Sequence, residues 1–308
     1  KKKFKIVNGN IMNPIFKKYL NEISEKCTFS PDLQGETPES TLHALWHAAA
    51  GTPLSPESAV LTPLLELNSE ERNKLDIFVN QRIAGIPLAQ IINRMHFMGL
   101  ELIYRPEVLV ARPETEILGE TIVEILGKQN RQNSSQIIIE IGCGSGNLTC
   151  GVLSRLKNAF IYAVDITEPC ALLTQENIQM HNLQDRVKVF TGDMFFPMIG
   201  LSLEGKIDAV FSNPPYISTK ALSDKNAHLL SYEPREAFDG GPFGLSIHQR
   251  LIKESGLYLR NGGYLFFEFG LGQERQVELL FSRNKIFSKP EFRKDARDNP
   301  RVAVVQKY

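Results

Sequence analysis

The feature that most constrains the fold is a buried strand that runs directly into a glycine-rich turn. It spans Ile137–Asn147, in the order Ile-Ile-Ile-Glu-Ile-Gly-Cys-Gly-Ser-Gly-Asn. Glycines after such a strand let a ligand approach the main chain closely before a helix begins. The spacing is Gly-x-Gly-x-Gly and lacks the later glycine of the Gly-x-Gly-x-x-Gly dinucleotide fingerprint. The stretch alone is therefore a weak indication of the ligand.

Three further apolar runs occur later in the chain, and each ends in a polar residue or leads into one. Phe160–Asp165 ends in an acid about twenty residues after the glycines, where a Rossmann-like site has its ribose-binding carboxylate. Val187–Phe190 is followed by Gly192-Asp193, which places another acid beyond a strand end. Lys206–Val210 leads into Asn213. This alternation of strands, helices and acids is far more specific than any single piece of it.

The last of these strands ends in Phe211-Ser-Asn-Pro-Pro-Tyr216. The two prolines fix φ and favour extended conformations before them, so the Asn213 amide and the Tyr216 ring are held in place. Pro214 and Pro215 have no N–H group to compete for nearby carbonyls. The Asn213 oxygen and a carbonyl can together accept both hydrogens of a planar –NH2 group while the ring packs on its face. This predicts a site for an amide or an aromatic amine, although a proline-rich turn would also explain the motif taken alone.

Taken together, these stretches resemble class I S-adenosylmethionine (SAM) methyltransferases, and Asn-Pro-Pro-Tyr resembles the motif of their amino-methyltransferases. More narrowly, the chain is similar to the HemK/PrmC family of release-factor glutamine N5-methyltransferases from about Leu88 onward. The remaining matching stretches are Val110–Glu116, Glu233–Ala237, Gly240–Leu245, Lys294-Asp295 and Arg301-Val302.

The resemblance implies an α/β fold with two domains. We expect a class I SAM-methyltransferase Rossmann-like sheet, mostly parallel with its last strand antiparallel, and a small helical N-terminal domain joined to it by a β-hairpin. The expected parts are a helical substrate-recognition domain over residues 1–87, a β-hairpin linker over 88–116 and a SAM-dependent methyltransferase domain over 117–308.

Local signals add detail to this outline. Ser55-Pro56 and Asn68 are typical helix starts in the N-terminal part. In the linker we expect strands at Phe97–Tyr104 and Val108–Val110 on either side of Arg105-Pro106. The long polar stretch Ser218–Pro242 is expected to be a loop that shapes the pocket mouth.

The resemblance also assigns the site. The residues expected to bind SAM are Gly142, Cys143, Gly144, Ser145, Gly146, Asp165, Asp193, Met194 and Asn213, with Asp165 on the ribose and Met194 against the adenine. The substrate amide is expected to contact Asn213, Pro214, Pro215 and Tyr216, of which Asn213, Pro214 and Tyr216 are the expected catalytic residues. No metal is expected, because the pair His43 and His47 lacks further ligands.

Three departures from the family pattern bear on the substrate. Ala111 stands where a proline is usual, and Gly240-Gly-Pro-Phe-Gly-Leu245 replaces Gly-Gly-x-Asp-Gly-Leu. Thr37–Trp46 stands where the family has a helix signature that contains arginine and acidic residues. A specialised relative that methylates another amide, or a guanidine-like group in a small molecule, is therefore one alternative. A second is a nucleic-acid adenine or cytosine amino-methyltransferase, with the flipped base on Tyr216. A third, a dinucleotide-binding oxidoreductase or a non-catalytic binding module, does not explain Asn-Pro-Pro-Tyr.

Composition bears on partners and compartment. Lys plus Arg and Asp plus Glu both total 35, and this zero net charge argues mildly against a nucleic-acid binder. The four cysteines form no Cys-x-x-Cys pair, which fits reduced thiols. No run reaches transmembrane length, and no signal-peptide core follows the basic start Lys1–Lys5. We expect a cytoplasmic monomer that acts on a peptide-chain release factor in translation termination, with no stable nucleic-acid or membrane binding.

Overall fold

The computed structural model describes residues 14–29, 35–129, 135–224, 230, 233–282 and 284–308. The basic start Lys1–Lys5 lies outside these ranges. The chain divides into two compact units, Lys1–Pro106 and Glu107–Tyr308.

The first unit is helical with one hairpin. Its elements are α1 (Pro14–Lys26), α2 (Pro38–Ala49), α3 (Pro56–Val60), α4 (Ser69–Ile83), α5 (Leu88–Ile92), β1 (Arg94–Phe97) and β2 (Leu100–Ile103). Both predicted helix starts are confirmed: the Ser55 side chain caps α3, and the Asn68 side chain accepts a hydrogen bond from the Glu71 main-chain nitrogen at 2.9 Å. The core centres on Trp46, which is 2% exposed and donates its indole N–H to the Leu65 carbonyl at 2.8 Å.

The hairpin lies earlier in the chain than predicted. Its turn is Met98-Gly99, where both residues have positive φ (49° and 82°), as a two-residue hairpin turn with the right-handed twist of its strands requires. The predicted turn at Arg105-Pro106 is therefore wrong, and Val108–Val110 forms no strand. Pro106 is a strong local turn signal, but the strands pair across the tighter turn at Met98-Gly99.

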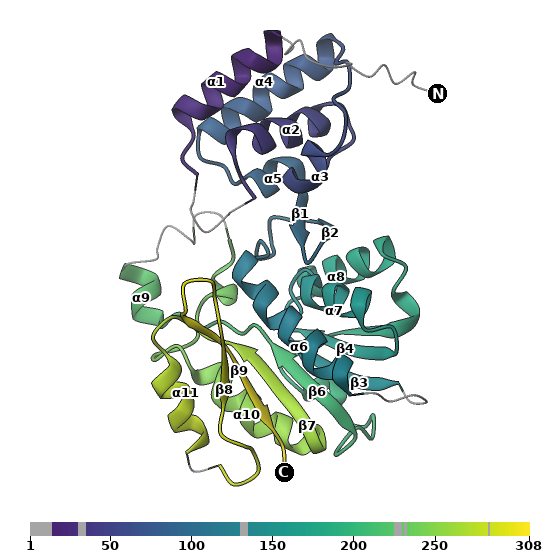
Figure 1. Ribbon diagram of the computed structural model, residues 1–308, viewed down its shortest axis with the longest axis vertical. Coiled ribbons are helices and arrows are strands. Elements are labelled where there is room, and N and C mark those ends of the chain that lie inside the picture. Colours follow the sequence, from purple (N-terminus) through teal and green to yellow (C-terminus); the bar gives the residue numbers. More distant parts are fainter. Residues whose placement is uncertain (1–13, 30–34, 130–134, 225–229, 231–232, 283) are drawn as a thin grey trace. The chain divides into compact units, whose positions relative to one another are not determined.

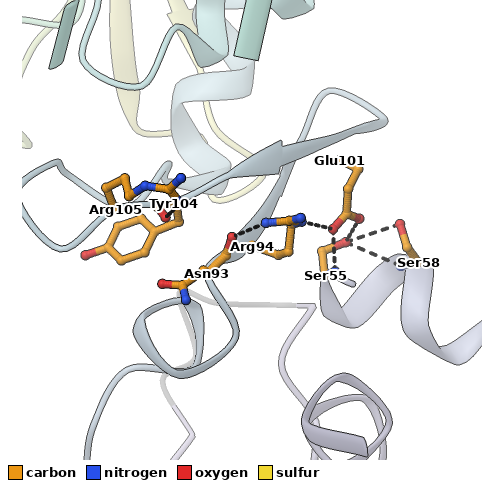
Figure 2. A network of polar contacts seen from close by, with 7 residues as sticks. All are labelled: Ser55, Ser58, Asn93, Arg94, Glu101, Tyr104 and Arg105. Carbon is orange, nitrogen blue, oxygen red and sulfur yellow. Dashed lines mark hydrogen bonds and ion pairs between the residues drawn. The ribbon is translucent and has the colours of Figure 1, made fainter. Parts of the chain in front are cut away.

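A carboxylate fastens this hairpin to the helices of the first unit (Figure 2). Glu101, on β2, accepts hydrogen bonds from the main-chain nitrogen and the hydroxyl of Ser55 at 2.7 and 2.6 Å. The Arg94 guanidinium on β1 lies 3.9 Å from the same carboxylate. The start of α3 and both hairpin strands thus meet at one partly buried polar cluster, which explains why the hairpin is part of the helical unit.

The second unit is built on a seven-stranded sheet with the strand order β5-β4-β3-β6-β7-β9-β8. The strands are β3 (Gln136–Ile141), β4 (Ala159–Asp165), β5 (Val187–Thr191), β6 (Ile207–Ser212), β7 (Leu259–Glu268), β8 (Glu291–Lys294) and β9 (Pro300–Gln306). Strands β3 to β7 pair in parallel, whereas β9 is antiparallel to both β7 and β8. The predicted mostly parallel α/β sheet with an antiparallel last strand is confirmed. The short edge strand β8 was not predicted, since it has no apolar run.

Helices flank this sheet. They are η1 (Pro113–Thr115), α6 (Glu116–Lys128), α7 (Asn147–Arg155), α8 (Glu168–Met180), η2 (Gln184–Arg186), η3 (Phe196–Met198), α9 (Thr219–Asp224), η5 (Arg235–Ala237), α10 (Ser246–Tyr258) and α11 (Glu274–Phe281). Within the second unit, α7 and α8 lie beside β4 and α10 lies beside β7 (Figure 1). The stretch Ser218–Pro242, predicted as a loop, contains α9 and η5 in its described part, while 225–229 and 231–232 lie outside the described residues.

The sheet determines where a site can form. Because β3, β4, β6 and β7 run in parallel, their carboxyl ends meet at one edge of the sheet, where open α/β sheets bind ligands. The predicted glycine turn, Asp165 and Asn213 all follow these ends. None of the helices in the described ranges reaches the length and hydropathy that crossing a bilayer requires.

Candidate active site

The turn after β3 exposes its main chain. Gly142 and Gly144 have φ of 75° and 55°, values that favour glycine, and a Cβ built on either would meet nothing within 4 Å. The main-chain nitrogens of Gly142 and Cys143 donate to the Val164 carbonyl at 2.8 and 3.0 Å, which ties the turn to β4. A Cβ on Gly146 would lie 3.0 Å from Thr174, so this third glycine packs against α8. The first two glycines therefore leave open space for a ligand.

Asp165, at the end of β4, holds this turn in place. One carboxylate oxygen accepts a hydrogen bond from the Gly144 main-chain nitrogen at 2.8 Å, and the other accepts from the Thr167 main chain at 3.0 Å. Nearby, the Cys143 thiol is buried, and burial raises its pKa well above the ordinary value. The Ser145 hydroxyl lies 3.2 Å from the Asn147 side-chain oxygen. The structure thus brings the predicted Gly142–Gly146 segment and Asp165 together.

The turn after β5 adjoins the same place. The Gly192 main-chain nitrogen donates to the Asp165 carbonyl at 2.8 Å. Asp193 accepts two hydrogen bonds from the Arg250 guanidinium, both at 2.9 Å. Met194 is only 6% exposed and belongs to the hydrophobic core of the unit. Most of its side chain therefore faces the protein interior.

The Asn-Pro-Pro-Tyr segment leaves β6, the neighbour of β3, and is held from several sides. The Asn213 side-chain nitrogen donates to the Thr115 hydroxyl at 3.1 Å. The Tyr216 hydroxyl donates to a Glu268 carboxylate oxygen at 3.2 Å, and the Tyr216 carbonyl accepts from the Gln273 amide at 3.0 Å. Pro214 is buried and Pro215 is half-buried. The segment is thus fixed by tertiary contacts as well as by its prolines.

A loop after η5 presses on this segment. A Cβ on Gly240 would lie 2.7 Å from the Pro215 carbonyl, and one on Gly244, whose φ is 72°, would lie 2.3 Å from the Tyr216 carbonyl. Both distances are far shorter than a van der Waals contact, so only glycine allows these two segments of the chain to approach this closely. These glycines belong to the Gly240–Leu245 stretch in which the family resemblance was noted.

Glu268 was not assigned a role from the sequence. It ends β7, is 1% exposed, and lies between Tyr216 and the Arg301 guanidinium, which is 3.8 Å away. The same guanidinium is 3.6 Å from a Glu114 oxygen. Burial raises the pKa of Glu268 to about 7, although hydrogen bonding by Thr115 and the charge of Arg301 lower it. An acid at the carboxyl end of a buried strand, the pattern that singled out Asp165, could have indicated it.

A second buried acid, Glu140, lies within β3. The Glu140 carboxylate accepts a hydrogen bond from the Thr149 hydroxyl of α7. Burial raises its pKa to about 8. A largely protonated carboxyl can stay buried there without a counter-ion.

Two distant matching stretches also meet in the second unit. The Arg112 guanidinium donates to one oxygen of Glu233, and the other oxygen accepts from the Val110 main-chain nitrogen at 2.8 Å. This contact joins the segment before η1 to the segment before η5.

The residues present fit SAM. Open space above Gly142 and Gly144 leaves room for a ligand against the main chain, and the carboxylate of Asp165 beside it suits ribose hydroxyls. Asn213 and Tyr216, from the adjacent strand end, suit an amide acceptor. Within the described residues, no group of three or more His, Cys, Asp or Glu side chains is arranged to hold a metal ion.

Comparison with known proteins agrees with this geometry. Residues 119–242 match the family model of the methyltransferase small domain. The chain is 33% identical over 246 residues to the release factor glutamine methyltransferase of Clostridium botulinum, covering 80% of this chain and 84% of that protein. It is 37% identical over 202 residues to the one from Moorella thermoacetica, covering 66% and 68%.

Among solved structures, the human methyltransferase 10 domain containing protein has a similar fold, with a TM-score of 0.50 and 17% identity over 68% of this chain and 90% of that chain. The predicted methyltransferase fold and the dependence on SAM are confirmed. Because the chain is 33% identical to the Clostridium botulinum protein over most of both chains, the protein belongs to the release factor glutamine methyltransferase family.

Proposed function

We propose that this protein transfers the methyl group of SAM to the N5 nitrogen of a glutamine side chain, that of the Gly-Gly-Gln loop of a peptide-chain release factor. One observation carries the proposal: Asn213 and Tyr216 are held rigidly beside the glycine turn. Strands β3 and β6 are neighbours, with Ile141 opposite Ser212, so the turn and the Asn-Pro-Pro-Tyr segment start at the same level of the sheet. Similar proteins named release factor glutamine methyltransferase support the same acceptor.

An amide nitrogen is a poor nucleophile because its lone pair is delocalised into the carbonyl, so the chain's main contribution is positioning. In the proposed complex, the Asn213 oxygen and the Pro214 carbonyl accept the two N–H bonds of the glutamine amide, and Tyr216 packs on its plane. Positive charge develops on the amide nitrogen during transfer, which strengthens both hydrogen bonds in the transition state. The methyl–sulfur bond breaks as the methyl–nitrogen bond forms, and the amide nitrogen then loses one of its two protons to water. The Asn213 nitrogen already donates to Thr115, so its oxygen, on the other side of the carboxamide, serves the substrate.

The cofactor contacts are part of the same proposal. SAM supplies, when bound, an electrophilic methyl group on a sulfonium. Residues Gly142 to Gly146 would receive its methionine end, and Asp165 its ribose hydroxyls. Asp193 and Met194 would flank the adenine, Met194 through the small part of its surface that remains exposed.

The remaining roles concern the partner. We assign release-factor recognition to the helical domain, residues 1–87, and methyl transfer to the methyltransferase domain, 117–308. In the segment predicted as the linker, 88–116, the hairpin of β1 and β2 lies in the helical unit. Segment 218–242 would shape the pocket mouth. The zero net charge favours a protein acceptor over stable binding of nucleic acid. A monomeric state and a cytoplasmic location remain predictions.

One assay tests the acceptor. A purified release factor and its Gln→Glu loop variant are incubated with labelled SAM, and mass spectrometry locates the label. The wild-type factor should gain one methyl group on the glutamine. The variant should gain none, because glutamate has no amide hydrogens and its carboxylate would face acceptor oxygens. Methylation of DNA or RNA without transfer to the release factor would contradict the proposal and favour a nucleic-acid amino-methyltransferase.

A further inference from the structure

The turn between β7 and α11 is hydrogen-bonded to the Asn-Pro-Pro-Tyr segment through one side chain, Gln273. Its Nε2 donates to the Tyr216 carbonyl at 3.0 Å, and its Oε1 accepts from the Gly270 main-chain nitrogen at 2.8 Å. The Gln273 main-chain nitrogen donates back to the Gly270 carbonyl at 3.1 Å. The side chain is therefore tied to its own turn by its oxygen and to the proposed acceptor segment by its nitrogen.

Close packing restricts the same place. A Cβ built on Gly270 would lie 2.9 Å from Gln273 Oε1 and 3.0 Å from the Tyr216 ring carbon Cδ2. A Cβ on Gly244, in the segment before α10, would lie 2.9 Å from Gln273 Nε2. Two glycines from different parts of the chain thus lie against Gln273 and Tyr216, and the Gln273 amide has little room to rotate.

The chemistry of the two partners requires an amide at this position. A main-chain N–H can only donate a hydrogen bond and a carbonyl can only accept one, so the side chain between Gly270 and Tyr216 must offer one acceptor and one donor. A carboxamide carries both on a single planar group. A carboxylate could accept from Gly270 but would face the Tyr216 carbonyl with a second acceptor. An ammonium group could donate to Tyr216 but could not accept from Gly270.

The bond to Tyr216 is made between two anchored parts of the chain. β6 pairs with β3 and β7 as far as Ser212, and the Ile217 main-chain nitrogen donates at 3.0 Å to the carbonyl of the residue after η5. Between them, the two prolines of the motif have no N–H group to donate. The bond from Gln273 thus holds the Tyr216 peptide group two residues after the Pro214 carbonyl, the second acceptor proposed for the substrate amide.

We propose that Gln273 is a positioning residue for methyl transfer. Through the Tyr216 carbonyl it holds the main chain of the Asn-Pro-Pro-Tyr segment, so that the Pro214 carbonyl and the Tyr216 ring stay aimed at the acceptor amide. The inference rests on the proposed glutamine methylation, in which the Pro214 carbonyl accepts one amide N–H. Because that hydrogen bond strengthens as positive charge develops on the nitrogen, a misdirected carbonyl lowers the rate of transfer more than it weakens binding.

Two substitutions separate the two hydrogen bonds, using the full chain, SAM and a purified release factor. Gln273→Glu keeps the acceptor for Gly270 and loses the donor for Tyr216, and its negative charge suits the start of α11. Its turnover number should fall about tenfold or more, while its free energy of unfolding stays close to that of the wild type. Gln273→Lys keeps a donor for Tyr216, loses the acceptor for Gly270 and places a positive charge at the helix start. It should be the less stable but the more active of the two variants.

This reversed order is the readout that a purely structural role would not give. If Gln273 served only to hold the start of α11, turnover would follow stability, and Gln273→Lys would be slower than Gln273→Glu. The SAM affinity of both variants should stay within about twofold of the wild-type value, because Gln273 follows β7, which β6 separates from the cofactor turn after β3. Gln175→Glu, the same substitution at an exposed position of α8, is the matched control and should leave turnover and stability unchanged.

Labelled-SAM transfer, urea unfolding and calorimetry supply the three measurements. The proposal is overturned if Gln273→Glu keeps the wild-type turnover number, or if Gln273→Lys is slower than Gln273→Glu. If Gln273→Glu does not fold, Gln273→Met, which lacks both the donor and the acceptor, replaces it and should show the same loss of turnover. A wild-type protein that transfers no methyl group to the release factor rejects the proposed function, whereas wild-type transfer together with either overturning result rejects this inference alone.

Discussion

The carboxylate of Asp165 accepts a hydrogen bond from the main-chain nitrogen of Gly144 at 2.8 Å. This bond joins the end of β4 to the turn that follows β3, so the proposed ribose contact and the proposed methionine contact form one rigid piece. The second carboxylate oxygen accepts a hydrogen bond from the main-chain nitrogen of Thr167, the residue before α8. A change at Asp165 should therefore affect the cofactor in two ways, by removing a partner and by loosening the turn.

The first prediction concerns this residue. Asp165→Ala should weaken SAM binding by about 1–3 kcal/mol, the scale of lost hydrogen bonds to a charged group. Calorimetry with SAM measures the effect, and Asp185→Ala, an exposed acid on η2, serves as the control. Unchanged SAM affinity in Asp165→Ala would remove this residue from the site.

The second prediction separates chemistry from cofactor binding. Asn213→Ala should abolish detectable methyl transfer, because the acceptor oxygen that grips the substrate amide is lost. SAM affinity should change by only a few-fold. Tyr216→Ala should reduce transfer less completely, since the hydrogen bonds of Asn213 remain. Near wild-type turnover of Asn213→Ala at saturating release factor would show that the amide-gripping model is wrong.

The third prediction concerns the close approach at Gly244. A methyl group there would lie 2.3 Å from the Tyr216 carbonyl, and φ is 72°. Gly272 has a φ of 78° but open space around it, so Gly272→Ala isolates the backbone strain, about 1–2 kcal/mol. Gly244→Ala should lower the free energy of unfolding by more than this and should also reduce methyl transfer. Equal losses in the two variants, measured by urea unfolding, would mean that the contact with Tyr216 is unimportant.

The fourth prediction is a pH dependence of stability that comes from Glu140. Burial raises its pKa to about 8 in the folded protein, whereas the value in the unfolded chain is about 4.3. Between these values the folded state binds the extra proton, so this contribution stabilises at low pH and is lost as pH rises through about 8. The slope approaches roughly 1.4 kcal/mol per pH unit inside the window.

Glu140→Gln copies the protonated carboxyl and should flatten the curve. Unfolding measured at several pH values from about 5 to 8 should show this, while Glu278→Gln, on the exposed surface of α11, should keep the wild-type slope. A Glu140→Gln variant with the same slope as the wild type would show that Glu140 is already ionised in the folded protein.

The sequence by itself determined the parts of this protein that depend on neighbouring residues. The runs Ile137–Ile141 and Phe160–Asp165 are apolar enough to be buried strands wherever they lie, and they are β3 and β4. Ser55 before Pro56 was sufficient for the start of α3. The glycines permit a tight turn with positive φ, and the two prolines after Asn213 restrict the backbone locally. The positions of the turn and of the Asn-Pro-Pro-Tyr segment could therefore be predicted.

Only the tertiary structure decided which distant groups meet. Thr115 and Asn213 are 98 residues apart, and nothing in either local pattern pairs them. The same holds for Glu268 and Tyr216. The position of the hairpin turn was also decided by the pairing of its strands, which places the turn at Met98-Gly99 and not at Arg105-Pro106. A local pattern reports backbone preference and burial, whereas a hydrogen bond between strand ends depends on the order and register of the strands in the sheet. The hydrogen bond between Asn213 and Thr115 is a property of that assembled edge.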